Sequence, residues 1–310
     1  MRKVAIGTRG SRLALIQAGI ARKALEEAFP QLDVEIREIK TTGDVITDIP
    51  LEKIGDKGLF IKELEAALLD KEIDLAVHSM KDMPTALPEG LKIGAVMERE
   101  KPWDVFISAG GNRKLSDLKP GEQVGSSSLR RRAQLLHHFP HLEICPIRGN
   151  VDTRLKKLQQ GDYDGIILAY AGVRRMGWSE QISEIIPGDI CLPSVGQGAI
   201  GLEIRAGDRQ IEELVSVLNC NRTEAQVLAE RTFLRKLEGG CQVPVGALAE
   251  SRAGEIILKG MVASLDGKLM FQGEKRGNPG EAEAIGESLA GELLEEGCGN
   301  ILDQIRRECG

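Results

Sequence analysis

The chain has 310 residues, of which 42% are hydrophobic and 28% charged, a composition typical of a globular protein with two or three domains. The net charge of -6 and the 3% of aromatic residues offer neither a basic surface nor stacking platforms, so we expect no nucleic acid partner. The start Met1-Arg2-Lys3-Val4 leads directly into strand-like sequence without a signal peptide, and no run approaches the ~20 apolar residues of a membrane span, which predicts a cytoplasmic protein with no membrane partner.

Strand and helix patterns alternate in the first part of the chain. The order is a strand at 4–8, a helix capped by Ser11 and ending near Pro30, a strand at 34–36, a helix at 60–68 and a strand at 75–77. This alternation predicts a mostly parallel sheet, in which ligands bind beyond the carboxyl ends of the strands. Residues 42–58 have no clean period and contain Gly, Asp and Pro, which is typical of a long loop that is either a lid or disordered.

The same alternation returns after the charged segment 98–102. A strand at 123–125, a helix at 126–139, a strand at 142–147, a helix at 151–160 and a strand at 165–169 predict a second α/β domain.

Amphipathic helices at 208–218 and 222–237 follow the second domain, and Gly239-Gly240 ends the helical pattern. Beyond Cys241 the sequence predicts strands joined by turns and a last helix at about 281–296. These elements predict a small α+β domain with Cys241 at its entrance.

Hydroxyl and guanidinium groups gather at the start of the helix at 126–139. The run places Ser127 and Ser128 beside Arg130 and Arg131 at a helix N-terminus, where backbone N–H groups also favour anions. A capped helix with a solvated basic face would explain the same residues.

Further cations follow other predicted strands, namely Arg9, Arg148 and Arg154. Together these arginines indicate a ligand rich in carboxylates. Phosphate is the rival ligand, although the chain has no phosphate-binding G-x-x-x-x-G-K-[ST] motif.

Asp82 lies directly after a buried strand, beside Lys81. A partly desolvated carboxylate in that place is able to stabilise a cation, whereas a turn-capping role before Pro84 is the plainer explanation.

Two other patterns favour no cofactor or metal. Residues 196–201 match G-x-G-x-x-G, but the expected strand before it and helix after it are missing, so a glycine-rich crossover is preferred to nicotinamide or flavin binding. The six cysteines lack zinc spacing, and His137, His138 and His141 resemble a polar helix end, so we predict free thiols and no metal.

Seven short motifs, in the same order and at similar spacing, resemble the porphobilinogen deaminase (hydroxymethylbilane synthase) family. The resemblance covers residues 4–245, and the motifs are Thr8-Arg9 with Ser11, Gly58-Leu59-Phe60, His78-Ser79-Met80-Lys81-Asp82, Gly125-Ser126-Ser127-Ser128-Leu129-Arg130-Arg131, Arg148-Gly149-Asn150, Gln197-Gly198 and Glu238-Gly239-Gly240-Cys241.

The resemblance implies a fold of two periplasmic-binding-protein-like α/β domains around a cleft, plus a small C-terminal α+β domain. It implies domain 1 at residues 1–98 with 198–217, domain 2 at 99–197, and domain 3 at 218–310 with the cofactor cysteine.

The resemblance also implies a transferase of haem biosynthesis. Such an enzyme joins four porphobilinogen units head to tail, each with loss of ammonia, on a dipyrromethane primer, and releases hydroxymethylbilane by hydrolysis. The primer would be bound through a thioether to Cys241, and Asp82 would be the catalytic carboxylate. The implied cofactor-binding residues are Cys241, Lys81, Asp82, Ser127, Ser128, Arg130, Arg131 and Arg154, and the implied substrate-binding residues are Arg9, Ser11, Phe60, Arg148, Arg154 and Gln197.

Porphobilinogen is therefore the expected small-molecule partner, and a monomer is the expected state. A non-enzymatic protein that captures a small dicarboxylate with the same arginines is the alternative, since fold does not dictate function. Such a protein would have no use for both Asp82 and Cys241.

Overall fold

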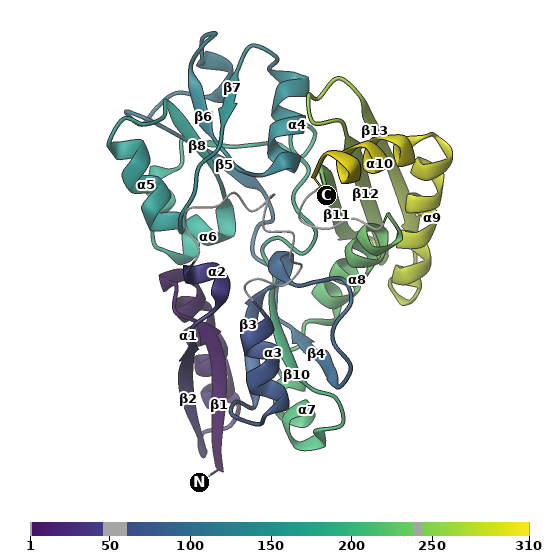
Figure 1. Ribbon diagram of the computed structural model, residues 1–310. Helices are drawn as coiled ribbons and strands as arrows, with labels where there is room; N and C mark the ends of the chain where they lie inside the picture. The colour runs from purple at the N-terminus through teal and green to yellow at the C-terminus, as the bar shows by residue number, and fades with distance from the viewer. Residues whose placement is uncertain (1, 46–60, 238–242, 310) are drawn as a thin grey trace. The chain divides into compact units, whose positions relative to one another are not determined.

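The computed structural model describes residues 2–45, 61–237 and 243–309 (Figure 1). The chain divides into two compact units. Unit 1 consists of Met1–Glu100 and Ala199–Ala225, and unit 2 of Lys101–Gly198 and Gln226–Gly310. The polypeptide therefore passes from one unit to the other three times.

Unit 1 is built on a five-stranded sheet of order β2-β1-β3-β10-β4. Its strands are β1 (Arg2–Arg9), β2 (Leu32–Ile39), β3 (Leu75–Ser79), β4 (Leu91–Val96) and β10 (Ile200–Arg205). β1 runs parallel to β2 and β3, whereas β10 is antiparallel to both of its neighbours. The predicted, mostly parallel sheet is thus confirmed, and its one antiparallel strand, β10, lies between β3 and β4.

Unit 1 contains the helices α1 (Arg12–Ala28), α2 (Thr42–Val45), α3 (Lys62–Leu69) and α7 (Arg209–Ser216). α1 packs on the sheet because Ala14, Ala18, Ala21 and Leu25 recur at helical spacing and are buried. The predicted loop at 42–58 begins with the single helical turn α2, and its residues 46–58 lie outside the described part of the chain.

Unit 2 contains a second five-stranded sheet, of order β7-β6-β8-β5-β9. Its strands are β5 (Asp104–Ser108), β6 (Gln123–Gly125), β7 (Glu143–Cys145), β8 (Gly165–Ala169) and β9 (Glu184–Ile185), with helices α4 (Leu129–His138), α5 (Val151–Gln159) and α6 (Tyr170–Arg175). β6 is parallel to β7 and β8, and β5 is antiparallel to β8 and β9. Both sheets therefore have one antiparallel strand in the fourth place, which confirms two α/β modules of one pattern.

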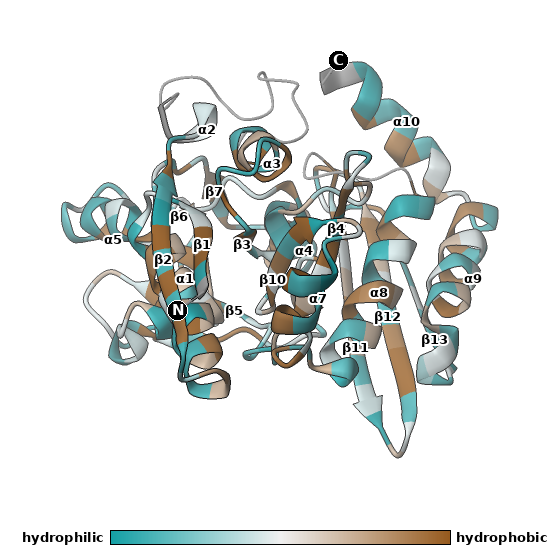
Figure 2. Ribbon diagram, turned by 90° about the horizontal axis from the view of Figure 1, so that it is seen from below, coloured by the Kyte–Doolittle hydropathy of each residue, from teal (hydrophilic) through white to brown (hydrophobic). Residues whose placement is uncertain are grey.

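The C-terminal part of unit 2 is an antiparallel sheet of β11 (Val245–Arg252), β12 (Glu255–Ala263) and β13 (Met270–Gly277). Helices α9 (Ala282–Glu295) and α10 (Cys298–Cys309) lie beside it, and α8 (Asn221–Lys236) leads into it from unit 1 (Figure 1). β12 is mostly hydrophobic, as its brown colour shows (Figure 2). The predicted α+β domain is confirmed, whereas α10 was not predicted.

Candidate functional site

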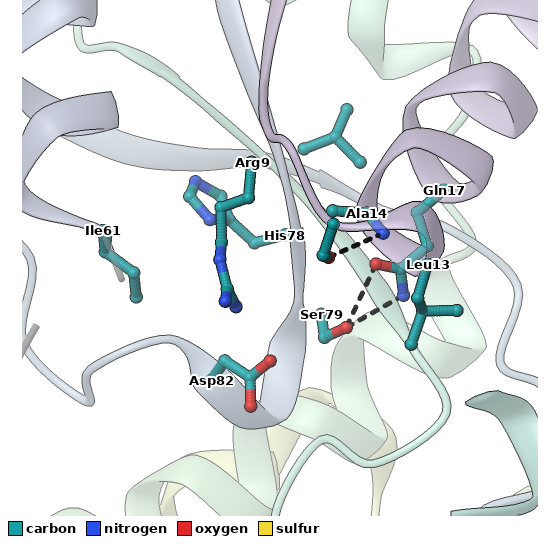
Figure 3. A pocket seen from close by; sticks show the side chains of 10 residues that line it. Arg9, Leu13, Ala14, Gln17, Ile61, His78, Ser79 and Asp82 are labelled. Carbon is teal, nitrogen blue, oxygen red and sulfur yellow. Dashed lines mark hydrogen bonds between the residues drawn. The ribbon is translucent and has the colours of Figure 1, made fainter. Parts of the chain in front are cut away.

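A pocket in unit 1 brings together residues from two of the sequence motifs, Thr8-Arg9 with Ser11 and His78-Ser79-Met80-Lys81-Asp82. Arg9, Ser11, His78 and Asp82 line it, together with side chains of α1 and Ile61. Figure 3 shows the side chain of Arg9 extending toward Asp82. The carboxyl ends of β1 and β3 lie at this edge, as the rule for parallel strands predicts.

Hydrogen bonds of α1 fix the rim of this pocket. Ser11 caps the helix by accepting a bond from the Ala14 amide, at 3.3 Å. Gln17, buried on the same helix, donates through Nε2 to the Ser79 hydroxyl at 2.8 Å. Of the residues predicted to bind substrate, the structure therefore brings Arg9 and Ser11 to the same pocket as Asp82.

Asp82 ends a 3-10 turn (Met80–Asp82) that directly follows β3. The turn is anchored by Met80, which is buried and whose amide donates to the Ala199 carbonyl at 3.0 Å. Lys81 is half-buried and Asp82 is exposed. The expected partial desolvation of Asp82 is therefore wrong for this structure, because the turn directs its carboxylate away from the core.

A buried ionisable pair that includes His78 of the pocket lining was not predicted. His78 Nε2 lies 3.0 Å from Glu203 Oε2, and both side chains are buried. Burial, followed by the charge of Glu203, raises the pKa of nearby Glu65. Glu203 follows the alternation of a strand, a pattern that predicts an exposed side chain, so the sequence gives no signal that it is buried.

In unit 2, Arg130 and Arg131 form a buried cluster around one carboxylate. Asp104 Oδ2 binds Nη2 of Arg130 at 2.8 Å, and Oδ1 binds Nη2 of Arg131 at 2.7 Å. Asp104 is completely buried and the arginines are 5% and 6% exposed. The alternative of a solvated basic face is therefore wrong, although the helix is capped by Ser128.

Gln197 and Cys191 complete this cluster. Gln197 donates through Nε2 to Asp104 Oδ1 at 2.9 Å and to the Pro102 carbonyl at 2.6 Å. These bonds hold the side-chain amide of Gln197 inside unit 2, and its expected contact with the substrate stays a prediction. Burial raises the pKa of the Cys191 thiol to about 12, so this side chain stays neutral.

The charges of the cluster do not balance. Two guanidinium groups and one carboxylate give a net charge of +1, and among the described residues Asp104 is the only carboxylate paired with either arginine. In addition, Nε of Arg131 is buried without a hydrogen-bond partner. A buried positive charge with an unused N–H donor fits an anionic ligand such as a carboxylate.

A second group of predicted residues lies at the start of α5. Ser127 donates to the Ile147 carbonyl at 2.7 Å and accepts from the Ile147 amide at 2.9 Å, which fixes the residue before Arg148. Arg154 donates through Nε to the Gly149 carbonyl at 2.8 Å. The hydroxyl proton of Ser127 is thus used internally, and its role is to hold the segment that carries Arg148.

Two predicted site residues, Phe60 and Cys241, lie outside the described residues. Within the described parts, the free cysteines are Cys145, Cys191, Cys220 and Cys298. None of the helices in those parts has the length and hydrophobicity of a membrane span.

Comparison with known families identifies two consecutive parts of the chain. Residues 4–213 match the model of the porphobilinogen deaminase dipyrromethane cofactor binding domain, and residues 225–295 match that of the porphobilinogen deaminase C-terminal domain. The chain belongs to the porphobilinogen deaminase family. It is therefore a transferase of tetrapyrrole biosynthesis that acts on porphobilinogen with a dipyrromethane cofactor.

Full-length relatives agree with this family. The chain is 54% identical to a porphobilinogen deaminase of Carboxydothermus hydrogenoformans, over 99% of this chain and 98% of that one. It is 55% identical to a porphobilinogen deaminase of Desulforudis audaxviator, over 98% of both chains. Among solved structures, it is similar to the periplasmic VFT2 domain of Bordetella pertussis BvgS, with 16% identity, 69% of this chain and 84% of that chain covered, and a TM-score of 0.41, from which we draw nothing further.

Proposed function

We propose that this enzyme joins four porphobilinogen units head to tail on a dipyrromethane bound through a thioether to Cys241, and releases hydroxymethylbilane by hydrolysis. The observation that carries the assignment of residues is the buried cluster with its net charge of +1 and the unused Nε of Arg131. The bound dipyrromethane supplies the free pyrrole carbon on which the product grows.

We assign four arginines of unit 2 to the binding of carboxylate groups on the cofactor and on the incoming unit. Arg130 and Arg131 hold a carboxylate of the cofactor, because their cluster is one negative charge short. Arg148 and Arg154, at the start of α5, take carboxylates of the cofactor and of the incoming unit, since a guanidinium binds a carboxylate through two parallel hydrogen bonds. Ser127 holds the backbone next to Arg148, and Ser128 caps the helix that carries the buried arginines.

The residues of unit 1 are assigned to the reacting unit. Arg9 and Ser11 bind its polar groups beside Asp82, in the pocket that all three line. Asp82 stabilises the positive charge that develops as ammonia leaves and accepts the proton released when the new bond forms. Its exposure lets that proton pass directly to water, and Lys81 contributes a cation beside it.

The intact mass of the denatured chain tests the covalent attachment. The wild type is expected to exceed its sequence mass by two porphobilinogen units less two ammonia, and Cys241→Ala to show the bare mass. Cys220→Ala is the matched control, because Cys220 is a half-buried thiol whose pKa is lowered by hydrogen bonds from Thr223, against the effect of burial. A bare wild type that gains no mass from porphobilinogen would contradict the proposal, and loss of the adduct in Cys220→Ala would move the attachment site.

The remaining assignments concern the whole chain. We infer three domains, at residues 1–98 with 198–217, 99–197 and 218–310, since each would hold one of the three sheets, the segment 198–217 returning β10 to the first. We also infer a cytoplasmic monomer. We infer no nucleic acid partner, because the net charge of -6 is opposite in sign to that of a typical nucleic-acid-binding protein. Light scattering at working concentrations measures the oligomeric state.

A further inference from the structure

Asp104 is the centre of the arginine cluster, and neither its pattern in the sequence nor the proposed chemistry singles it out. It is the first residue of β5 and directly follows the segment at which the chain enters unit 2. Its carbonyl accepts a bond from the Ile186 amide at 2.9 Å, and its Cα pairs with that of Ala169 on β8. The position of its side chain is therefore fixed by the sheet.

The two carboxylate oxygens of Asp104 are fully used. Oδ1 accepts from Arg131 at 2.7 Å and from Gln197 at 2.9 Å, and Oδ2 accepts from Arg130 at 2.8 Å and from the Cys191 thiol at 3.5 Å. Four donors on two oxygens leave no room for a ligand group on this carboxylate. Asp104 therefore acts on other side chains and not on a substrate.

The arginines, by contrast, are only partly used. Nη1 of Arg130 donates to the Leu192 carbonyl at 2.6 Å, and Nη1 of Arg131 to the Ile167 carbonyl at 2.9 Å. Each guanidinium is thus held by a backbone carbonyl and by Asp104, and Nη1 of Arg130 also donates to the Cys191 sulfur at 3.3 Å, so the plane of each group is fixed. The buried Nε–H of Arg131 is left over.

The charge of Asp104 sets the charge of the whole cluster. Burial alone would raise the pKa of Asp104, but the charges of Arg130 and Arg131 outweigh it and hold the pKa well below its usual range. Without this carboxylate, two guanidinium groups would face each other with a net charge of +2. With it, the cluster retains the charge that a single carboxylate neutralises.

We propose that Asp104 is a positioning residue of the cofactor site, which orients Arg130 and Arg131 and leaves one positive charge and the Arg131 Nε–H for one carboxylate of the dipyrromethane. This inference rests on the proposed function, because it takes the two arginines as cofactor ligands. Asp104 would control how fast the chain acquires its cofactor and would take no part in bond formation.

Chemical rescue of Asp104→Ala tests this role. The full-length chain, produced in cells that cannot make porphobilinogen, is incubated with porphobilinogen, and the adduct is followed by intact mass. We expect loading of Asp104→Ala to be slower by about 100-fold, because a buried charge pair loses one partner. Formate fits the space of the deleted carboxylate and should restore loading by about tenfold, whereas neutral formamide should not.

Thermal melting, recorded with and without formate, separates positioning from stability. If formate raises the melting temperature but leaves loading slow, Asp104 is structural and the proposal is overturned. Glu122→Ala is the matched control, because Glu122 also binds a guanidinium, that of Arg113, but at a more exposed place. It should load at the wild-type rate without formate.

A second variant keeps the proposal testable if Asp104→Ala does not fold. Arg131→Lys retains the positive charge beside Asp104 but removes the Nε–H and the planar fork. We expect it to fold and to load at least about tenfold more slowly than the wild type. Loading at the wild-type rate would overturn the proposal, whereas a wild type that gains no mass would overturn the proposed function itself.

Discussion

Glu230 offers a sharp test of how α8 is tied to the rest of unit 2. Its side chain is fully buried, and its carboxylate accepts from the Gly196 amide at 2.7 Å and from the Ala249 amide at 2.8 Å. One carboxylate therefore joins the glycine-rich crossover to strand β11. Glu230→Gln keeps the shape of the side chain but turns one acceptor into a donor.

The expected loss follows from these two bonds. A hydrogen bond to a charged group contributes about 1.5–3 kcal/mol, and a buried N–H without a partner costs about 1–3 kcal/mol. Because Gln keeps one acceptor, we expect Glu230→Gln to lose one bond and to destabilise unit 2 by about 2–4 kcal/mol. At about 2–4 °C per kcal/mol, the melting temperature should fall by about 5–15 °C.

Thermal unfolding followed by circular dichroism measures this loss. Glu224→Gln on the same helix is the control, because Glu224 is exposed and accepts a bond from the side chain of Asn219, so the variant should change the melting temperature by less than about 2 °C. A Glu230→Gln variant that melts within about 2 °C of the wild type would refute the reasoning.

Three other perturbations have expected outcomes. Asp82→Asn should slow product formation by about 100- to 10,000-fold with an unchanged melting temperature, since the side chain is exposed, and Asp82→Glu should recover part of the rate in the same assay. Gly267→Ala should cost at least about 3 kcal/mol in denaturant unfolding, because a Cβ there would lie 2.5 Å from a backbone oxygen of α4, whereas Gly254→Ala, which also has positive φ but open space around it, should cost about 1–2 kcal/mol. Iodoacetamide at neutral pH should modify Cys220 and spare the buried Cys191, as peptide mass mapping would show. Equal labelling of both thiols would contradict the burial of Cys191. Because the pKa of Cys191 is raised from 9.0 to about 12 on folding, its contribution to stability is present below pH 9 and is lost as pH rises from 9 toward 12.

The elements with clear periodicity could be predicted from the sequence. The helical spacing in α1, with its Ser11 cap, and the strands β1 and β3 gave the first α/β module. Strands β4 and β5 were missed. β5 is buried at all five of its positions, so it lacks the alternation of a half-exposed strand, and its length is too short to distinguish it from other apolar runs.

The candidate site divides in the same way. Asp82 and Arg9 were found because they follow strands whose carboxyl ends meet at one edge. The partnership of Asp104 with Arg130 and Arg131 was not, because it joins the start of one strand to a helix 26 residues later, and nothing local marks that contact. The hydrogen bond from Gln197 to the carboxylate that the arginines share was not predicted either, because Gln197 and Asp104 lie 93 residues apart in the sequence.

The reversed strand of unit 1 has a consequence for synthesis on the ribosome. β10 lies between β3 and β4, yet about 100 residues separate the end of β4 from its start. At about 5–20 residues per second, the nascent chain spends roughly 5–20 s with β3 as an open edge and β4 without its neighbour. The five strands β5 to β9 are all made within that interval, so the sheet of unit 2 can close before the sheet that precedes it in the sequence. A stalled or truncated chain that ends before Ile200 would therefore expose the centre of the first sheet to chaperones and proteases.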